Sequence, residues 1–223
     1  MRLMCTGRID PALVARAFKM GLDGLLVVGC YFGDCHYITG NVQAQAKMDI
    51  TRRLFTHIGV NGDRLAFRQC SSGEASVFVN LVTEFDARIR ELGPLGGEGD
   101  RVKAPEIFGK LGVAEAVLGG EKIRWVIGKR TPFLESGNKY GEVFTEHEFH
   151  RAIDMIVVEE TELQEILLQL KEGARSVKDL AAATAIPAER VFRYITALKR
   201  KGMVALEKVS GRTPIFQLAA QEG

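Results

Sequence analysis

Four cysteines, Cys5, Cys30, Cys35 and Cys70, are the side chains of this chain best suited to chemistry. The sequence has no apolar run long enough to cross a bilayer, and its first residues lack the apolar core of a signal peptide. We therefore expect a cytoplasmic protein with no membrane partner. Because thiols stay reduced in that compartment, four of them indicate metal binding or redox chemistry before structural disulfides.

Short apolar runs and amphipathic stretches alternate over the first 95 residues. The pattern predicts the end of a strand at Arg2–Met4, a strand at 24–29 and a strand at 64–69. A helix is expected after each strand: one opened by Asp10-Pro11 and ended by Gly21, one over 41–58, and one running to about Leu92. This order predicts an α/β domain with a parallel sheet flanked by helices.

The cysteines lie at corresponding places in this pattern. Cys5, Cys30 and Cys70 each follow a predicted strand directly, and Cys35 lies in the loop that Cys30 begins. Functional groups of an open parallel sheet gather at the carboxyl ends of its strands, so we expect all four thiols along one edge. Four thiolates suit a [2Fe–2S] cluster, a [4Fe–4S] cluster or a tetrahedral zinc ion.

Glycines beside the cysteines favour a cluster, because exposed backbone N–H groups can donate hydrogen bonds to bridging sulfides. The alternative is that each cysteine is a small buried core residue. His36, next to Cys35, is a further ligand candidate, although a plain loop residue is the favoured interpretation. The segment Ser71-Ser72-Gly73-Glu74 is expected to cap the following helix, the alternative being that its N–H groups face an anion. The glycines in question are Gly29, Gly33, Gly40 and Gly73.

The clearest boundary in the sequence is Gly93–Gly99, which is too rich in glycine and proline to hold a regular element. We divide the chain into an iron–sulfur α/β domain at 1–95, a helical connector at 96–160 and a last domain at 161–223. Within the connector, Trp125 and its neighbours Ile123, Val126 and Ile127 are expected to pack on one of the larger units, with Trp125 as a structural anchor.

The last domain reads as three helices followed by a β-hairpin. Ser176 is expected to cap the second helix and Pro187 to open the third. This order is typical of a winged helix-turn-helix domain. The expected helices cover 161–173, 177–184 and 187–201, and the strands cover 203–207 and 214–218 with a turn at 210–212.

Two motifs carry a resemblance to a known family. The segment Cys5–Pro11 and the motif Gly-Cys-x-x-Gly-Asp-Cys-His-Tyr at Gly29–Tyr37 resemble the delta subunit of methyl-viologen-reducing (F420-non-reducing) hydrogenase. Gly40-Asn41 and the stretch from Glu84 to Pro94 extend the resemblance over roughly residues 1–95. It implies a flavodoxin-like fold that lacks its first strand here, since family members usually begin with another strand and a Cys-x-x-Cys motif. The missing piece would be lost from a truncated gene model or carried by another polypeptide.

The resemblance also implies a [2Fe–2S] cluster. Cys5, Cys30 and Cys35 match the cysteine positions of the family, whereas Cys70 has the sheet position without the family motif. Cys70 is the fourth candidate ligand, in place of the absent cysteine pair.

By the same resemblance the protein relays electrons and makes no bonds of its own. Its partners would be a hydrogenase or formate dehydrogenase and the flavin-containing subunit of a heterodisulfide-reductase-like complex, with the winged helix as a docking module. The alternative is a redox-sensing transcription regulator that binds DNA. Glu172, Glu189 and Glu207 dilute the basic surface on which that alternative depends, and the formal net charge of +2 demands no polyanion. The basic residues are Arg190, Arg193, Lys199, Arg200, Lys201 and Arg212.

Overall fold

The chain divides into two compact units, Met1–Val157 and Val158–Gly223, of which the computed structural model describes residues 2–219. The first unit is mixed α/β and holds all four cysteines. Its elements are η1 (Thr6–Arg8), α1 (Pro11–Lys19), β1 (Leu25–Gly29), α2 (Gly40–Ile58), η2 (Gly62–Arg64), β2 (Leu65–Gln69), α3 (Ala75–Leu92), α4 (Glu106–Gly119), α5 (Glu121–Glu135) and the start of α6 (Glu146–Glu172).

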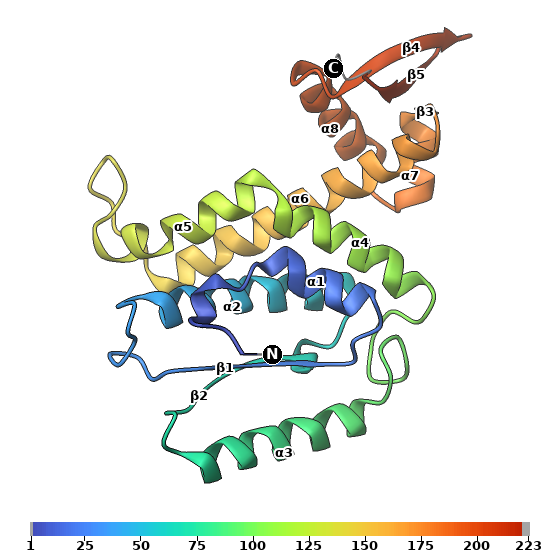
Figure 1. The fold of residues 1–223 in the computed structure, drawn as a ribbon. Helices are drawn as coiled ribbons and strands as arrows, with labels where there is room; N and C mark the ends of the chain where they lie inside the picture. The colour runs from blue at the N-terminus through green and yellow to red at the C-terminus, as the bar shows by residue number, and fades with distance from the viewer. Residues whose placement is uncertain (1, 220–223) are drawn as a thin grey trace. The chain divides into compact units, whose positions relative to one another are not determined.

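The sheet of the first unit consists of β1 and β2, paired in parallel from Leu25 opposite Leu65 to Gly29 opposite Gln69. Helices α1 and α2 lie on one face of this sheet and α3 on the other (Figure 1). The expected parallel strands flanked by helices are therefore confirmed.

The strand expected at Arg2–Met4 is wrong, because the structure has no strand there. The chain instead turns at Cys5, whose Sγ accepts a hydrogen bond from the Gly7 N–H at 3.4 Å and caps η1. A strand is defined by its ladder of hydrogen bonds to a neighbour. Among the described residues, the ladder of β1 runs to β2 alone.

Helices from the expected connector complete the core of the first unit. α4 packs on α1 and α2, and α5 packs on α2. Phe18 of α1 meets Phe55 of α2 edge-on, with ring centroids 5.0 Å apart, in the middle of this layer. Large residues that are almost completely buried here are Leu54, Leu65, Ile107, Leu111, Leu118, Ile123 and Ile153.

The expectation that Trp125 anchors this region is wrong, since 53% of the residue is exposed. Its ring contacts Phe133 edge-on, with centroids 5.7 Å apart. The packing expected of its neighbours Ile123, Val126 and Ile127 is confirmed, because all three are buried in the core, so α5 turns its aliphatic side chains inward and its tryptophan outward.

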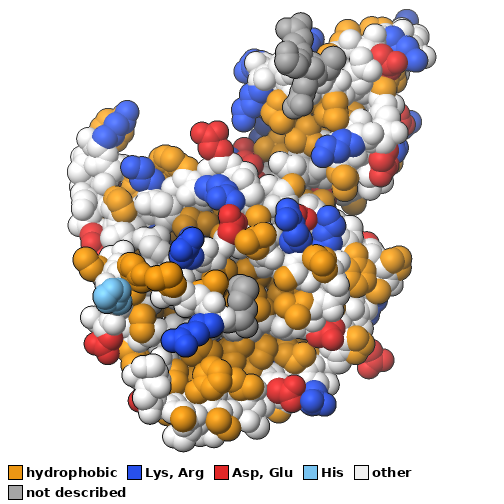
Figure 2. Space-filling view, in the orientation of Figure 1, with side chains coloured by type: hydrophobic (Ala, Val, Ile, Leu, Met, Phe, Trp, Pro, Cys, Tyr) orange, Lys and Arg blue, Asp and Glu red, His pale blue; other side chains and the backbone are white. Residues whose placement is uncertain are grey.

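Helix α3 is an exception to the close packing of the unit. Of its 18 residues, only Leu92 at the very end is buried. Figure 2 shows hydrophobic side chains at the surface between β1 and α3. The exposed apolar residues of α3 are Val77, Phe78, Val79 and Val82. None of the described helices, α3 included, combines the length and apolarity needed to cross a membrane.

A buried ion pair fixes the start of β2. Arg64 and Asp100 have fully buried side chains, and their Nη2 and Oδ2 atoms are 2.8 Å apart. The Arg64 Nε also donates to the other carboxylate oxygen at 3.0 Å. Asp100 in turn accepts hydrogen bonds from the backbone N–H groups of Asn61 and Gly96. Every charge is therefore met by a partner, which is the condition under which a buried ion pair is tolerated.

The same arginine holds the glycine-rich segment after α3. Its guanidinium donates to the carbonyl oxygens of Gly93 at 2.9 Å and Pro94 at 3.1 Å, and to Asp23 O at 2.9 Å before β1. The segment has no helix or strand, as its composition predicts, yet it is tied to both strands through one side chain.

The second unit holds the end of α6 and a three-stranded antiparallel sheet in the order β3-β5-β4. Ser176 and Asp179 form a capping box at the start of α7, which confirms the expected cap. β3 was not expected, because two residues are too short for a periodic signal. The elements are β3 (Arg175–Ser176), α7 (Val177–Thr184), α8 (Ala188–Arg200), β4 (Val204–Ser210) and β5 (Thr213–Leu218), around a core that includes Ile166, Leu180, Val191 and Ile195.

We predict that Asp100→Asn destabilises the first unit by about 3–5 kcal/mol, because the buried Arg64 charge loses its counter-ion. Urea unfolding followed by circular dichroism measures this change. Arg90→Met is the matched control, since it breaks an exposed pair with Asp86 on α3 and is expected to leave the midpoint unchanged. An Asp100→Asn midpoint equal to that of the control would contradict the role given to the pair.

Candidate functional site

Two of the four cysteines lie side by side where β1 and β2 end. Cys30 follows Gly29 directly and Cys70 follows Gln69, and these two strand residues are paired in register. The Cys70 N–H donates to Gly29 O at 2.9 Å, which carries the pairing one step past the last strand residue. Both backbones therefore lie at the same edge of the sheet, as the strand pattern predicts.

Cys5 and Cys35 come together at the first turn of α2. A β-carbon at Gly40 would collide with Cys5 Sγ and would lie 3.3 Å from Cys35 Sγ. Gly7 packs closely against Gly40, since a β-carbon at position 7 would be 2.7 Å from Gly40 O. Glycine at position 40 thus leaves the space that two thiols occupy, as its place beside the cysteines predicts.

Cys30 joins this group because its thiol is near enough to Cys35 and Cys5 for both of them to raise its pKa. Cys35 is buried, while Cys5 and Cys30 are partly exposed. Three thiols from two loops that are far apart in sequence are therefore neighbours at one end of the first unit.

Asn41 is the residue that holds this loop in place, and the sequence patterns assign it no role of its own. Its side chain is fully buried, and its Nδ2 donates to Tyr31 O at 2.7 Å and to Cys30 O at 3.1 Å. The same Nδ2 lies 3.6 Å from Cys30 Sγ. The signal in the sequence is the Gly40-Asn41 pair that follows the cysteine loop.

The thiols of Cys30 and Cys35 differ in acidity. A hydrogen bond from the Asn41 backbone N–H is the main reason why the pKa of Cys35 is below its usual value, and N–H groups of Tyr37 and Gly40 add to this effect. Burial acts in the opposite direction. For Cys30, burial is the main cause of a raised pKa, and the neighbouring Cys35 raises it further. Backbone donors of this kind stabilise a thiolate, whether free or bound to metal.

Cys70 is turned away from this group. Its Sγ donates to Ser71 O at 3.3 Å and to Glu74 O at 3.5 Å, toward the first turn of α3. It lines a hollow of about 740 Å³ together with Cys30 and Tyr31. The Tyr31 hydroxyl donates to the Glu74 carboxylate at 2.9 Å across this hollow.

The segment Ser71–Glu74 does lead into α3, with Glu74 as the N-cap residue, but the side-chain cap expected from it is absent. No side chain caps the helix, and the Glu74 carboxylate instead accepts the Ser71 N–H at 2.8 Å. Glu74 therefore ties the cysteine-bearing loop after β2 to Tyr31 in the loop after β1.

Ile38, three residues after Cys35, adopts a conformation that its side chain disfavours. Its φ of 64° lies in the left-handed region, which is strained for a β-branched residue. The Ile38 N–H donates to Cys35 O at 2.8 Å, and 83% of the residue is exposed. His36 is also exposed and meets Tyr37 edge-on at 5.1 Å. The strained turn thus sets the direction in which the chain passes from the cysteine loop into α2.

The thiols do not form a finished set of metal ligands. Within residues 2–219, no three His, Cys, Asp or Glu side chains are arranged so that they could hold a metal ion. Three thiols, those of Cys5, Cys30 and Cys35, are neighbours, and N–H groups donate to Cys35. The fourth thiol, that of Cys70, follows the strand beside Cys30 but points away from the group. These donors suit an anionic iron–sulfur group better than they suit a buried apolar core.

Comparison with known proteins places this site in a family. A family model described as "Methyl-viologen-reducing hydrogenase, delta subunit" matches residues 1–93, which include all four cysteines. An F420-non-reducing hydrogenase iron-sulfur subunit of Archaeoglobus profundus is 39% identical over 94 residues, covering 42% of this chain and 69% of the relative. The chain belongs to the methyl-viologen-reducing hydrogenase delta subunit family.

Other relatives show that this family segment occurs in different surroundings. The iron-sulfur subunit of the vhu F420-non-reducing hydrogenase of Methanocaldococcus jannaschii is 40% identical over 94 residues, which is 42% of this chain and 70% of the relative. One subunit of the ferredoxin:CoB-CoM heterodisulfide reductase of Methanosarcina mazei is 42% identical over 98 residues, or 44% of this chain. This chain spans only 12% of the length of that reductase subunit. Residues 94–223 lie outside the family match.

We predict that Cys35 loses its proton below the pH at which an ordinary cysteine does, because N–H donors stabilise its thiolate. Cys30 then titrates above the ordinary value, beside the charge just formed. Thiolate absorbance in the far ultraviolet, followed on the reduced, metal-free chain, measures both steps. The Cys35→Ser variant should lack the first step and Cys70→Ser should retain it. The difference between the wild-type and Cys35→Ser titrations gives the pKa of Cys35. A value at or above that of an ordinary cysteine would contradict this assignment.

Proposed function

We propose that this protein is an iron–sulfur electron-transfer subunit. It would relay electrons between a hydrogenase or formate dehydrogenase and the flavin-containing subunit of a heterodisulfide-reductase-like complex. The observation that carries the proposal is the meeting of Cys5, Cys30 and Cys35 at the N-terminus of α2, inside the segment that matches the family. The names of the relatives support it, since they are iron–sulfur subunits of hydrogenases and a subunit of a heterodisulfide reductase.

The cofactor we propose is a [2Fe–2S] cluster with Cys5, Cys30, Cys35 and Cys70 as ligands. When bound, such a cluster accepts and releases single electrons. The chain itself would supply thiolates, N–H donors at the start of α2 and the partial positive charge of that helix end, all of which stabilise an anionic group. Asn41 would keep the Cys30 loop in place through its bonds to two backbone carbonyls.

Cys70 is the ligand that needs the largest rearrangement. Its thiol would leave the carbonyl oxygens of Ser71 and Glu74 and turn toward Cys30. This movement is local, because the two backbones already pair through the Cys70 N–H. The flavodoxin-like assignment of the first unit and the division at 1–95, 96–160 and 161–223 remain part of the same proposal.

For residues 161–223 we propose a winged helix that docks a partner protein. The order of α7, α8 and the β4–β5 hairpin supports this fold. The surface of α8 favours protein over DNA, because one of its basic side chains is already engaged. Arg190 pairs with Glu162 at 2.6 Å, and the Tyr194 hydroxyl donates to the same carboxylate at 2.8 Å. The pKa of Tyr194 is raised, first because its phenol is partly removed from water and second because of its hydrogen bond to the Glu162 carboxylate.

We predict that the full chain, purified without oxygen or reconstituted, contains iron and sulfide and gives an EPR signal when reduced. Cys35→Ser and Cys5→Ser should each lose most of the iron, because they remove neighbouring ligands. Cys70→Ser is expected to do the same if the fourth thiol turns inward as proposed. Ser72→Ala, in the loop after β2, is the matched control and should bind iron as the wild type does.

Three results would overturn this assignment: no iron in the reconstituted chain, zinc in its place, or full iron content in Cys35→Ser. Co-purification with a flavoprotein and a hydrogenase or formate dehydrogenase is a separate, second test, which concerns only the proposed partners.

We also predict that the full chain does not bind duplex DNA in a strongly salt-dependent manner. Fluorescence anisotropy with a labelled duplex at about 50 and 200 mM salt tests this, because phosphate contacts lose affinity steeply over that range. Tight binding that weakens with salt and disappears in Arg193→Glu would favour the redox-sensing regulator over the docking module.

A further inference from the structure

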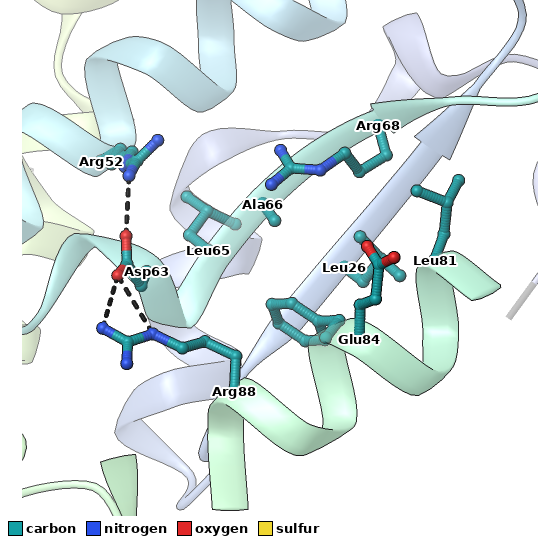
Figure 3. A pocket seen from close by; sticks show the side chains of 10 residues that line it. Leu26, Arg52, Asp63, Leu65, Ala66, Arg68, Leu81, Glu84 and Arg88 are labelled. Carbon is teal, nitrogen blue, oxygen red and sulfur yellow. Dashed lines mark hydrogen bonds and ion pairs between the residues drawn. The ribbon is translucent and has the colours of Figure 1, made fainter. Parts of the chain in front are cut away.

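The free edge of β2 is lined by a groove that the cysteine site does not use. Among the described residues, β2 pairs with β1 alone, so its other edge has no neighbouring strand. The groove has a volume of about 280 Å³ and lies between α2 and α3 (Figure 3). Its apolar lining comes from Leu26, Leu65, Ala66, Leu81 and Phe85.

One end of the groove is built rigidly. Asp63 accepts hydrogen bonds from Arg52 of α2 at 2.9 Å and from Arg88 of α3 at 2.8 and 3.2 Å (Figure 3). Arg88 also bonds to Glu91. These contacts close the groove near the start of β2 and join the helices on the two faces of the sheet. The groove is therefore preformed, and all three charges at this end are satisfied.

The open part of the groove carries two charges that are not satisfied in this way. Arg68 extends from β2 and Glu84 extends from α3, and both residues are exposed (Figure 3). No ion pair joins these two side chains in Figure 3. The Arg68 Nη1 donates at 3.0 Å to the carbonyl oxygen of Phe67, a neighbour on its own strand. The groove beside the edge strand thus carries one cation from β2, one anion from α3 and an apolar lining between them.

We propose that this edge is the interface of a homodimer, in which β2 pairs antiparallel with β2 of a second copy. A two-fold axis perpendicular to the sheet keeps both α3 helices on the same face and makes the contact self-complementary. Arg68 of each copy then meets Glu84 of the other, so the opposite charges on one surface are their own complement. Sheet edges with unpaired backbone groups are natural templates for such pairing.

The packing of α3 supports a second copy as the occupant. Val77, Leu81 and Glu84 follow one another at helical spacing on one side of α3, and Val77 is exposed. In the dimer this side of α3 faces its symmetry mate, so Val77 gains burial that it lacks within a single chain. Arg68 exchanges the carbonyl of its own strand for a carboxylate, which is the stronger hydrogen-bond acceptor.

Sedimentation equilibrium of the full chain tests the proposal. We expect a wild-type mass of twice 24.6 kDa at high micromolar concentration. Arg68→Glu and Glu84→Arg should each weaken dimerisation at least about tenfold, since the symmetry places like charges together twice. The double variant Arg68→Glu with Glu84→Arg restores both pairs and should dimerise nearly as well as the wild type.

Arg90→Glu is the matched control, because it makes the same change of charge on α3 outside the groove and should leave the dimer intact. A monomeric wild type at about 200 μM would overturn the proposal and leave the groove to a different chain. A dimer that is unaffected by either single substitution, or a double variant that stays monomeric, would overturn it as well. All these variants alter exposed side chains, so circular dichroism should show that each is folded.

Discussion

The buried pair of Arg64 and Asp100 is the constraint on which the first unit depends. An arginine without solvent must find a partner for each donor, and here those partners come from three separate stretches of chain. The strands β1 and β2 and the segment after α3 therefore meet at one guanidinium. Because β2 has one strand neighbour and a helix that buries little, its position depends on this network together with the buried side chains of Leu65 and Ala66. The strands in turn set the relative positions of the loops that begin at Cys30 and Cys70.

The four thiols occupy environments that differ in kind. Backbone donors at the start of α2 favour the thiolate of Cys35, burial opposes the thiolate of Cys30, and the Cys70 thiol bonds to carbonyl oxygens. A helix N-terminus and a glycine without a side chain are the two local means by which α2 accommodates negative charge. The strain at Ile38 lies in the same turn, between Cys35 and the start of α2.

Local features of the fold could be read from the sequence because they rest on short-range rules. Asp10, Ser176 and the two strands of the parallel sheet were predictable from caps and apolar runs. What could not be predicted depends on side-chain direction and tertiary partners. The rotation of α5 exposes Trp125, and the thiol of Cys70 points toward α3 although its backbone lies at the expected edge. The burial of Arg64 could not be predicted, because no residue near it in the sequence indicates that its counter-ion, Asp100, lies 36 residues later.

The distance along the chain between Arg64 and Asp100 has a consequence for biosynthesis. All four cysteines precede Asp100 in the sequence and are therefore synthesised before it. Until then the start of β2 carries an arginine without its carboxylate, and the parallel pairing with β1 must be closed over a long loop without that anchor. The thiols are thus made before the sheet that arranges them is secured. Maturation of the site therefore belongs after synthesis of the glycine-rich segment.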